Sequence, residues 1–298
     1  MKFKNFFLAL LCGVLATGLA GCGSSGAASP SSTAAPSTAV SVSEQDYASI
    51  PKPQGNDNTV SIGVTPIPHG EIVNNVVKPE MEKAGWKVKV VEFNDYVQPN
   101  TALSSGDIDA NYYQTTNYLA EANKKQNLHL VSVAAVHLEP MGLYSKTVKS
   151  LPELKDGSTI AVPNDSSNES RAIRLLAENG LFKVDSSSML TSKDITENPH
   201  KFKIMEVDAA NLARTLDDVN AAVINSNYAL QAKFNPTKDA IIKESSSSKN
   251  SSQYFNDLVV KKGNENTEKT KALKTAITSK AAKEYIEKNY KGAVIPAF

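Results

Sequence analysis

The stretch Ile160–Leu176, IAVPNDSSNESRAIRLL, reads as a strand, a break and the beginning of a helix. Ser166 and Glu169 have the S-x-x-E spacing of a capping box, which predicts a helix start, and Gly180 marks the expected end. Arg171 lies in the first turns of this helix, where a cation opposes the positive end of the helix dipole. A small anion bound by Arg171 and free backbone N–H groups would remove that conflict, and a solvated surface arginine is the alternative.

Strand and helix signals alternate along the rest of the chain. Residues 59–64 and 86–93 alternate apolar and polar side chains, and residues 71–84 between them read as a helix. Such a unit predicts parallel strands joined by a right-handed crossover. Residues 221–225, AAVIN, are nearly all apolar, as in a strand buried on both faces. The pattern predicts an α/β fold, and about 240 ordered residues suit two similar lobes better than one core.

The N-terminus has the features of a bacterial lipoprotein signal. Two lysines precede a short apolar core at residues 6–15, and Leu-Ala-Gly-Cys follows at residues 19–22. We expect residues 1–21 to be a signal peptide and Cys22 to be lipidated, and an ordinary signal peptide with an incidental cysteine is the alternative. Cleavage would also remove Cys12, so no disulfide and no cysteine-based metal site or nucleophile is expected.

Residues 22–58 are rich in Ser, Ala, Thr and Pro and poor in large apolar side chains. Such a composition cannot bury enough surface to fold, and it predicts a disordered tether. Without the two lysines of the signal, the 32 Lys and Arg fall to 30, against 31 Asp and Glu. This balance gives no reason to expect nucleic-acid binding. We expect a globular domain held by its lipid anchor on the extracytoplasmic face of a cell membrane.

The sequence motifs of common enzymes are absent. The chain has no G-x-S-x-G, Walker A, G-x-G-x-x-G or H-E-x-x-H motif. Its four histidines lack the spacing of metal ligands, and His129 and His200 stand beside lysine-rich turns, as surface residues do. Asp107 and Asp109 fit a turn with capping carboxylates better than an acid–base pair. We predict no catalytic residue, no cofactor and no metal site.

Polar and aromatic residues recur at the positions where predicted strands end. In open α/β sheets this edge is where ligands bind. Asparagines offer donors and acceptors, aromatic rings offer an apolar wall, and an arginine offers a bidentate fork for a carboxylate. Together they would suit a small zwitterion with an apolar side chain, such as an amino acid, although Tyr118 alone fits a core residue and Asn225 alone a turn. The clusters are Pro66–Gly70, Asp95–Tyr96, Tyr112–Tyr118, Asn164–Arg171 and Asn225–Tyr228.

Five stretches carry a more specific resemblance, and they follow one another along most of the chain. They are VVEFNDYVQPN (90–100), GDIDAN (106–111), LEPMGLYS (138–145), AVPNDSSNESR (161–171) and LDDVNAAVINSNYA (216–229). In these stretches the chain resembles the MetQ/NlpA family, the lipoprotein substrate-binding components of methionine ABC importers. The resemblance implies an amino acid ligand, with L-methionine favoured, and the permease and ATPase of an importer as partners.

The resemblance also implies a two-lobed, periplasmic-binding-protein-like clamshell with two crossovers between the lobes. One crossover is expected near residues 137–143 and the other near residues 253–260. Lobe 1 would then comprise residues 59–139 plus 256–298, and lobe 2 would comprise residues 140–255.

Roles for individual residues follow from the same resemblance. Arg171 would hold the ligand carboxylate with Asn168 beside it, and Asn225 would bind the amino and carboxylate groups. Two tyrosines would wall the side-chain pocket and a third would lie behind them. The expected ligand-binding residues are Arg171, Asn225, Asn168, Tyr113, Tyr96, Thr115, Tyr118 and His69.

One stretch departs from the family pattern. Where the family commonly has Phe-Gln-His followed by x-Pro-Tyr, this chain has YQTTNY at residues 113–118. Thr115 replaces a ring that would face the ligand thioether, Tyr113 adds a hydroxyl, and Ser170 replaces the glycine usual before the arginine. The resemblance therefore favours methionine and leaves open a related amino acid, a short Met-containing peptide, or an adhesion lipoprotein built on the same scaffold.

Overall fold

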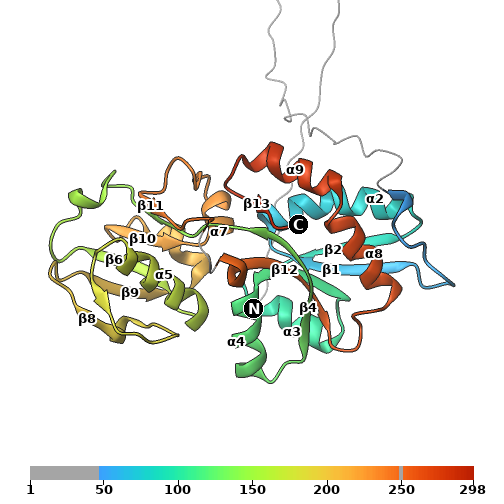
Figure 1. Ribbon diagram of the computed structural model, residues 1–298, viewed down its shortest axis with the longest axis horizontal. Helices are drawn as coiled ribbons and strands as arrows, with labels where there is room; N and C mark the ends of the chain where they lie inside the picture. The colour runs from blue at the N-terminus through green and yellow to red at the C-terminus, as the bar shows by residue number, and fades with distance from the viewer. Residues whose placement is uncertain (1–46, 248–250) are drawn as a thin grey trace, which may run out of the picture. The chain divides into compact units, whose positions relative to one another are not determined.

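The computed structural model describes residues 47–247 and 251–298, which fall in one compact unit. Two main sheets, each flanked by helices, make up this unit (Figure 1), as expected for a two-lobed α/β fold. The expected signal peptide, Cys22 and the tether as far as residue 46 lie outside the described residues. No helix in the described ranges is long and apolar enough to cross a bilayer.

The larger sheet is mixed, with the strand order β13-β4-β12-β3-β1-β2. Strand β1 pairs in parallel with β2 and β3, which confirms the predicted parallel β-α-β unit, whereas β12 runs antiparallel to β3 and β4. Its strands are β1 (Thr59–Val64), β2 (Lys87–Glu92), β3 (Ala110–Thr115), β4 (Leu130–Leu138), β12 (Phe255–Lys261) and β13 (Ile295–Pro296). The associated helices are η1 (Pro66–Gly70), η2 (Val73–Val77), α2 (Lys78–Lys83), α3 (Gln98–Ser105), α4 (Thr116–Gln126), α8 (Glu268–Ile277) and α9 (Lys280–Tyr290).

The smaller sheet has the strand order β11-β5-β10-β6-β9. Strand β6 pairs in parallel with β9 and β10, and β5 runs antiparallel to β10 and β11. Its strands are β5 (Gly142–Tyr144), β6 (Thr159–Pro163), β9 (Lys203–Val207), β10 (Ala221–Ile224) and β11 (Ile242–Lys243). Around it lie α5 (Ser166–Glu178), α6 (Leu212–Thr215), α7 (Ser226–Gln231), a hairpin of β7 (Lys183–Val184) and β8 (Ile195–Glu197), and the short turns η3 (Leu151–Glu153), η4 (Ser192–Asp194) and η5 (Ala209–Asn211).

Apolar periodicity explains the strands that the sequence predicts well. In β1 the alternate side chains of Val60, Ile62 and Val64 are fully buried in the core of the larger sheet. Every residue of β10 is fully buried, which confirms the prediction of a strand covered on both faces. Each sheet thus has its own apolar core, and the polar ends of its strands remain available for a site.

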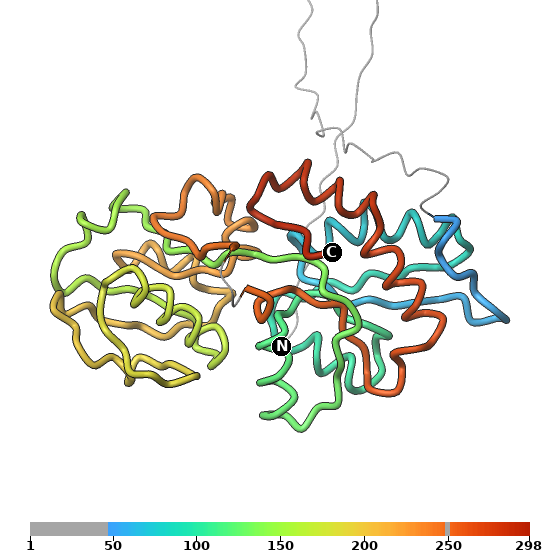
Figure 2. The backbone as a smooth tube through the Cα atoms, viewed as in Figure 1, coloured from blue at the N-terminus to red at the C-terminus, as the bar shows by residue number. Residues whose placement is uncertain are grey.

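The chain passes between the two sheets twice (Figure 2). The first crossing is residues 139–141, between β4 and β5, inside the expected range. The second leads from β11 to β12 and includes η6 (Ser251–Tyr254), directly before β12. It lies earlier than the expected residues 253–260, because residues 255–261 already pair with β3 and β4.

The prediction of a disordered tether is wrong for residues 47–58. Ile50 is buried in the core of the larger sheet, and the indole N–H of Trp86 donates to the carbonyl of Pro51 at 2.7 Å. Asp57 forms an ion pair with Lys269 at 2.9 Å. Composition did not predict that residues 47–58 are ordered, because the apolar groups that they contact come from elsewhere in the chain.

The opening stretch folds into β6 and α5 as predicted, and α5 ends before Gly180, whose φ is +80°. Its cap differs from the prediction. Asp165 takes the extended N-cap conformation and accepts from the backbone N–H of Asn168 at 2.9 Å, so Ser166 is already the first helical residue. Glu169 instead accepts from the backbone N–H of Ser192 at 2.9 Å.

Residues 112–118, expected to be a loop, form the end of β3 and the start of α4. Strand β3 has no polar–apolar alternation because its polar side chains are buried as well. Gln114 donates to Asn100 and Asn111 at 2.7 and 2.9 Å, and Asn100 donates back to Gln114 at 2.9 Å. Buried amides that satisfy one another remove the apolar signal that identifies a strand.

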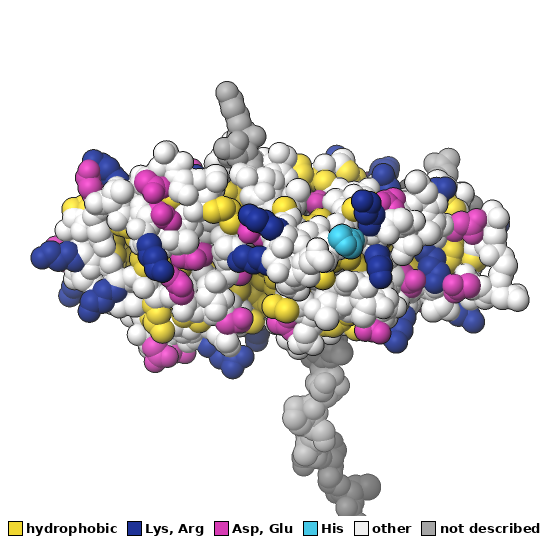
Figure 3. Space-filling view, turned by 90° about the horizontal axis from the view of Figure 1, so that it is seen from below, with side chains coloured by type: hydrophobic (Ala, Val, Ile, Leu, Met, Phe, Trp, Pro, Cys, Tyr) yellow, Lys and Arg dark blue, Asp and Glu magenta, His cyan; other side chains and the backbone are white. Residues whose placement is uncertain are grey.

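Basic and acidic side chains are interspersed on the face drawn in Figure 3. They do not gather there into one basic patch, in keeping with the near balance of charge along the chain.

Candidate ligand-binding site

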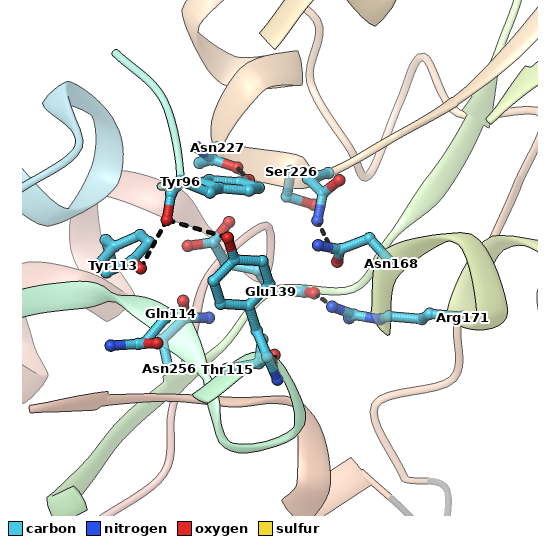
Figure 4. Close-up of a pocket in the computed structure, with 12 residues that line it drawn as sticks. Tyr96, Tyr113, Gln114, Thr115, Glu139, Asn168, Arg171, Ser226, Asn227 and Asn256 are labelled. Atoms are coloured by element: carbon cyan, nitrogen blue, oxygen red, sulfur yellow. Dashed lines mark hydrogen bonds between the residues drawn. The ribbon is translucent and has the colours of Figure 1, made fainter. Parts of the chain in front are cut away.

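A cavity of about 350 Å³, open solvent included, lies where the carboxyl ends of β3, β6 and β10 and the first crossing meet (Figure 4). Both sheets contribute to it, as do the loop after β2 and the start of β12. The lining residues are Tyr96, Tyr113, Gln114, Thr115, Tyr118, Glu139, Asn168, Arg171, Asn225, Ser226, Asn227 and Asn256.

Every expected ligand-binding residue except His69 lines this cavity. His69 lies one layer behind, where its Nε2 is hydrogen-bonded to Oδ1 of the lining residue Asn256 at 3.1 Å. Five lining residues were not among the expected ligand-binding residues. Four of them stand next to expected site residues or within the family-like stretches, whereas Asn256 has no such signal. These five residues are Gln114, Glu139, Ser226, Asn227 and Asn256.

Arg171 is the cation of the site, and its side chain is almost fully buried. Its Nε and Nη2 donate to the two carboxylate oxygens of Glu244 at 2.7 and 2.6 Å, and Nη2 also donates to the carbonyl of Glu139 at 2.7 Å. Burial lowers the pKa of Arg171, but attraction and hydrogen bonding to Glu244 outweigh it and leave the pKa raised. The guanidinium lies over the ring of Tyr254, 4.2 Å from its centroid. Arg171 is therefore a fixed cation and not a solvated surface arginine.

Two buried polar atoms at the cavity lack a hydrogen-bond partner among the described residues. They are Oδ1 of Asn225 and Nδ2 of Asn227. The other end of each amide is engaged, since Asn225 Nδ2 donates to Asn168 at 2.8 Å and the Tyr96 hydroxyl donates to Asn227 at 2.6 Å. A buried group left without a partner costs about 1–3 kcal/mol. One free acceptor and one free donor in the same cavity match a ligand that offers both kinds of partner.

Three tyrosines form the aromatic wall. The ring of Tyr96 lies 5.9 Å from that of Tyr113 and 5.7 Å from that of Tyr118. Both neighbours donate their hydroxyl to the carbonyl of Tyr96, at 2.8 and 3.0 Å. The extra hydroxyl of Tyr113 is thus satisfied by backbone, and burial raises its pKa so that it stays neutral. The rings are left to contact apolar ligand groups.

Thr115 lines the cavity and also has a structural role. It is the N-cap of α4, where its hydroxyl accepts from the backbone N–H of Tyr118 at 3.2 Å. A threonine at this position therefore stabilises the helix start.

A buried carboxylate and two histidines lie at the inner side of the cavity. Glu139 Oε1 is 2.7 Å from His137 Nε2 and 3.4 Å from His69 Nε2. Burial lowers the pKa of His137 to about 3 and that of His69 to about 4, and it raises the pKa of Glu139. The outer ring nitrogens are hydrogen-bonded to the hydroxyls of Tyr112 and Thr65. Both histidines are therefore neutral near pH 7.

The possible metal-ligating atoms of His69, His137 and Glu139 lie within 4.8 Å of one another. Sequence spacing could not show this cluster, because the fold brings η1 and β4 together. Each of the four ring nitrogens of His69 and His137 already has a hydrogen-bond partner. For Nε2 of His69 that partner is Oδ1 of Asn256. We interpret the cluster as a hydrogen-bonded support for the Glu139 carboxylate.

The cavity therefore combines a cation, a carboxylate, free amide atoms and an aromatic wall. The cation and carboxylate come from Arg171 and Glu139, which enter from different elements, and in Figure 4 the Arg171 side chain reaches from α5 toward Glu139. Opposite charges at one end and aromatic rings at the other fit a small zwitterion with an apolar side chain.

Comparisons with known proteins agree with this chemistry. The NlpA lipoprotein family model matches residues 60–298. The D-methionine-binding lipoprotein MetQ of Salmonella typhi is 42% identical over 242 residues, which cover 80% of this chain and 88% of that protein. The methionine-binding lipoprotein MetQ of Bacillus subtilis (strain 168) is 40% identical over 243 residues, covering 80% and 87%.

A solved structure extends the likeness to three dimensions. It is that of a nutrient binding protein from Burkholderia cenocepacia bound to methionine, with a TM-score of 0.77 and 44% sequence identity. The match covers 80% of this chain and 100% of that one.

Proposed function

Because this chain belongs to the NlpA lipoprotein family, we propose that it is a substrate-binding lipoprotein that captures L-methionine in its cavity and delivers it to an ABC importer. The observation that carries the proposal is the pair of unpartnered amide atoms on Asn225 and Asn227, set between a buried arginine and an aromatic wall. The names of the relatives MetQ and the methionine bound to the Burkholderia structure support the choice of ligand.

Each part of methionine has a counterpart in the cavity. The carboxylate would accept from Arg171 and from Nδ2 of Asn227, both of which lie on the side of the smaller sheet. The ammonium would donate to Oδ1 of Asn225 and to the carboxylate of Glu139. The thioether chain would extend toward the tyrosine wall, where sulfur–aromatic contacts are favourable.

Capture would involve closure of two lobes about the crossings, with lobe 1 formed by residues 59–139 plus 256–298 and lobe 2 by residues 140–255. Two hydrogen bonds join residues on opposite sides of this boundary. The Tyr96 hydroxyl donates to Asn227 at 2.6 Å, and Lys125 Nζ donates to the hydroxyl of Ser166 at 2.7 Å. We propose that these contacts hold the closed form.

The proposed setting is the extracytoplasmic face of a cell membrane, with a lipid on Cys22 as the anchor and the permease and ATPase of an importer as partners. Lipoprotein names among the relatives support the anchor. The proposed role needs no catalysis.

A thermal-shift screen of the mature chain, residues 22–298, tests the proposal. The panel contains the twenty L-amino acids, D-methionine, methionine sulfoxide and Met-containing dipeptides. Methionine at about 1,000 times its Kd should stabilise the protein by roughly 4 kcal/mol and raise Tm accordingly. A larger shift with another compound would reassign the ligand, and no shift with any compound would contradict a transport role and favour an adhesion lipoprotein.

A further inference from the structure

We propose that Glu244 is a positioning residue that holds Arg171 in the orientation needed to bind the ligand carboxylate. This inference rests on the proposed function, because it assigns a role to a residue that acts on methionine only through Arg171. Glu244 stands on the second crossing and does not line the methionine cavity. Arg171 lines both that cavity and a second one, to which Glu244 belongs.

The hydrogen bonds of Arg171 use the N–H of Nε and both N–H groups of Nη2. Glu244 takes the Nε–Nη2 edge with both of its oxygens, and the carbonyl of Glu139 takes a second contact from Nη2. No partner for Nη1 is found within residues 47–247 and 251–298. Tyr254 covers one face of the plane. With one edge bonded and one face covered, Nη1 is the part of Arg171 left to meet a carboxylate.

Glu244 is itself fixed by the first crossing. The backbone N–H of Met141 donates to its Oε2 at 2.8 Å, and its own backbone N–H donates to the carbonyl of Met141 at 3.0 Å. The carboxylate of Glu244, on the second crossing, therefore accepts hydrogen bonds from Arg171 of α5 and from Met141 of the first crossing. The side chain of Glu244 is only 16% exposed, so solvent competes little for these bonds.

An arginine needs such support because its long side chain has many rotamers. A guanidinium that changed rotamer would lose its alignment with the ligand carboxylate. A buried guanidinium without a counterion would also be strongly disfavoured. The carboxylate of Glu244 is the counterion of Arg171, and its two hydrogen bonds fix the orientation of the guanidinium. Glu244 does not line the methionine cavity, so Nη1 remains for the carboxylate of the ligand.

Isothermal titration of the mature chain with L-methionine and with L-methioninamide tests this role. The amide keeps the ammonium and the thioether but lacks the carboxylate. In Glu244→Gln we expect methionine to bind roughly 10- to 100-fold more weakly, since a charge-assisted contact loses its alignment, and methioninamide to change by less than about three-fold. Glu287→Gln is the control. It removes the same charge from an exposed position on α9 that lines neither cavity, and it should bind both compounds as the wild type does.

The outcomes separate the two proposals. If the wild type binds no amino acid, the proposed function fails. If the wild type binds methionine and Glu244→Gln binds it equally well or more tightly, only the positioning role is overturned. Equal losses for methionine and methioninamide would show a general effect on the fold or closure and would also overturn it. Should Glu244→Gln not fold, Glu244→Asp carries the test: it keeps the charge with a shorter reach, and it should weaken methionine alone, by a smaller factor.

Discussion

Replacing Asn225 with alanine should weaken methionine binding while it changes the stability of the ligand-free protein little. Asn225 donates to Asn168 at 2.8 Å, and its Oδ1 is buried without a partner among the described residues. Loss of the hydrogen bond costs about 1 kcal/mol, and removal of the unpartnered acceptor relieves about 1–3 kcal/mol. Because Asn168 then loses its donor, we expect a net change in the free energy of unfolding below about 1 kcal/mol.

The effect on binding should be larger. In the proposed complex, Oδ1 of Asn225 accepts a hydrogen bond from the ligand ammonium. Hydrogen bonds to charged groups contribute about 1.5–3 kcal/mol, which corresponds to a roughly 10- to 100-fold increase in Kd on their removal. The free energy of unfolding and the Kd for methionine should therefore change independently, because Oδ1 of Asn225 gains its hydrogen bond only when methionine binds.

Urea unfolding measures the first quantity and isothermal titration with methionine the second. Asn198→Ala is the control with the opposite pattern. The Asn198 side chain bonds only the backbone of Phe202, at 2.9 and 3.0 Å, and it is not among the cavity-lining residues. Its removal should lower stability by about 1–3 kcal/mol and leave Kd unchanged. An Asn225→Ala protein that bound methionine within two-fold of the wild type, or that lost stability and affinity together, would refute the role of Oδ1.

Four further changes test other parts of the site. Arg171→Ala should abolish methionine binding in titration, and a variant that still bound it would show that the carboxylate lies elsewhere. Tyr113→Phe should keep Kd within about three-fold but lower the free energy of unfolding by about 1 kcal/mol, because only a bond to backbone is lost; a large rise in Kd would show that the hydroxyl contacts ligand. Thr115→His should tighten methionine binding if a ring fills the space beside the thioether, at a cost of about 1 kcal/mol in stability for the lost helix cap, and weaker binding would contradict that placement. For His137 the folded pKa of about 3 lies below the unfolded value of about 6.5, so the unfolded state takes up the proton first as pH falls and stability declines by up to about 1.4 kcal/mol per pH unit between these values. His69, with a pKa of about 4, adds a slope of the same sign, so His137→Gln should lower the slope by about half in urea unfolding between pH 6.5 and 5, and an unchanged slope would mean that His137 is not neutral in the folded protein.

Local sequence patterns predicted the elements whose apolar signal is self-contained. The alternation in β1 and the apolar run of β10 describe strands whose burial depends on their own side chains. The rule that ligand sites follow strand ends placed Arg171, Asn225 and Tyr113 correctly at one cavity, although they come from three different segments.

Patterns failed where burial depends on partners distant in the chain. Strand β3 buries amides that are satisfied by Asn100, by the carbonyl of Pro99 and by one another, so its polar sequence looks like a loop. Ile50 packs in the core of the larger sheet. The composition of the residues around Ile50 does not predict this contact. In both cases tertiary contacts outweigh local propensity.

The same limit applies to the site. Glu244 lies 73 residues from Arg171, and no motif links the two, yet their bidentate ion pair determines how the arginine faces the cavity. His69 and His137 are likewise brought to Glu139 only by the pairing of distant segments. Sequence reasoning could name many of the groups that line the cavity, whereas the groups that orient them required the fold.

The most direct test of methionine capture is isothermal titration of L-methionine into the mature chain, refolded from denaturant so that no ligand is carried over. We predict one site per chain, a Kd of about 1 μM or below, and weaker binding of methioninamide. Absence of binding up to millimolar methionine, with the protein folded, would contradict the proposed function.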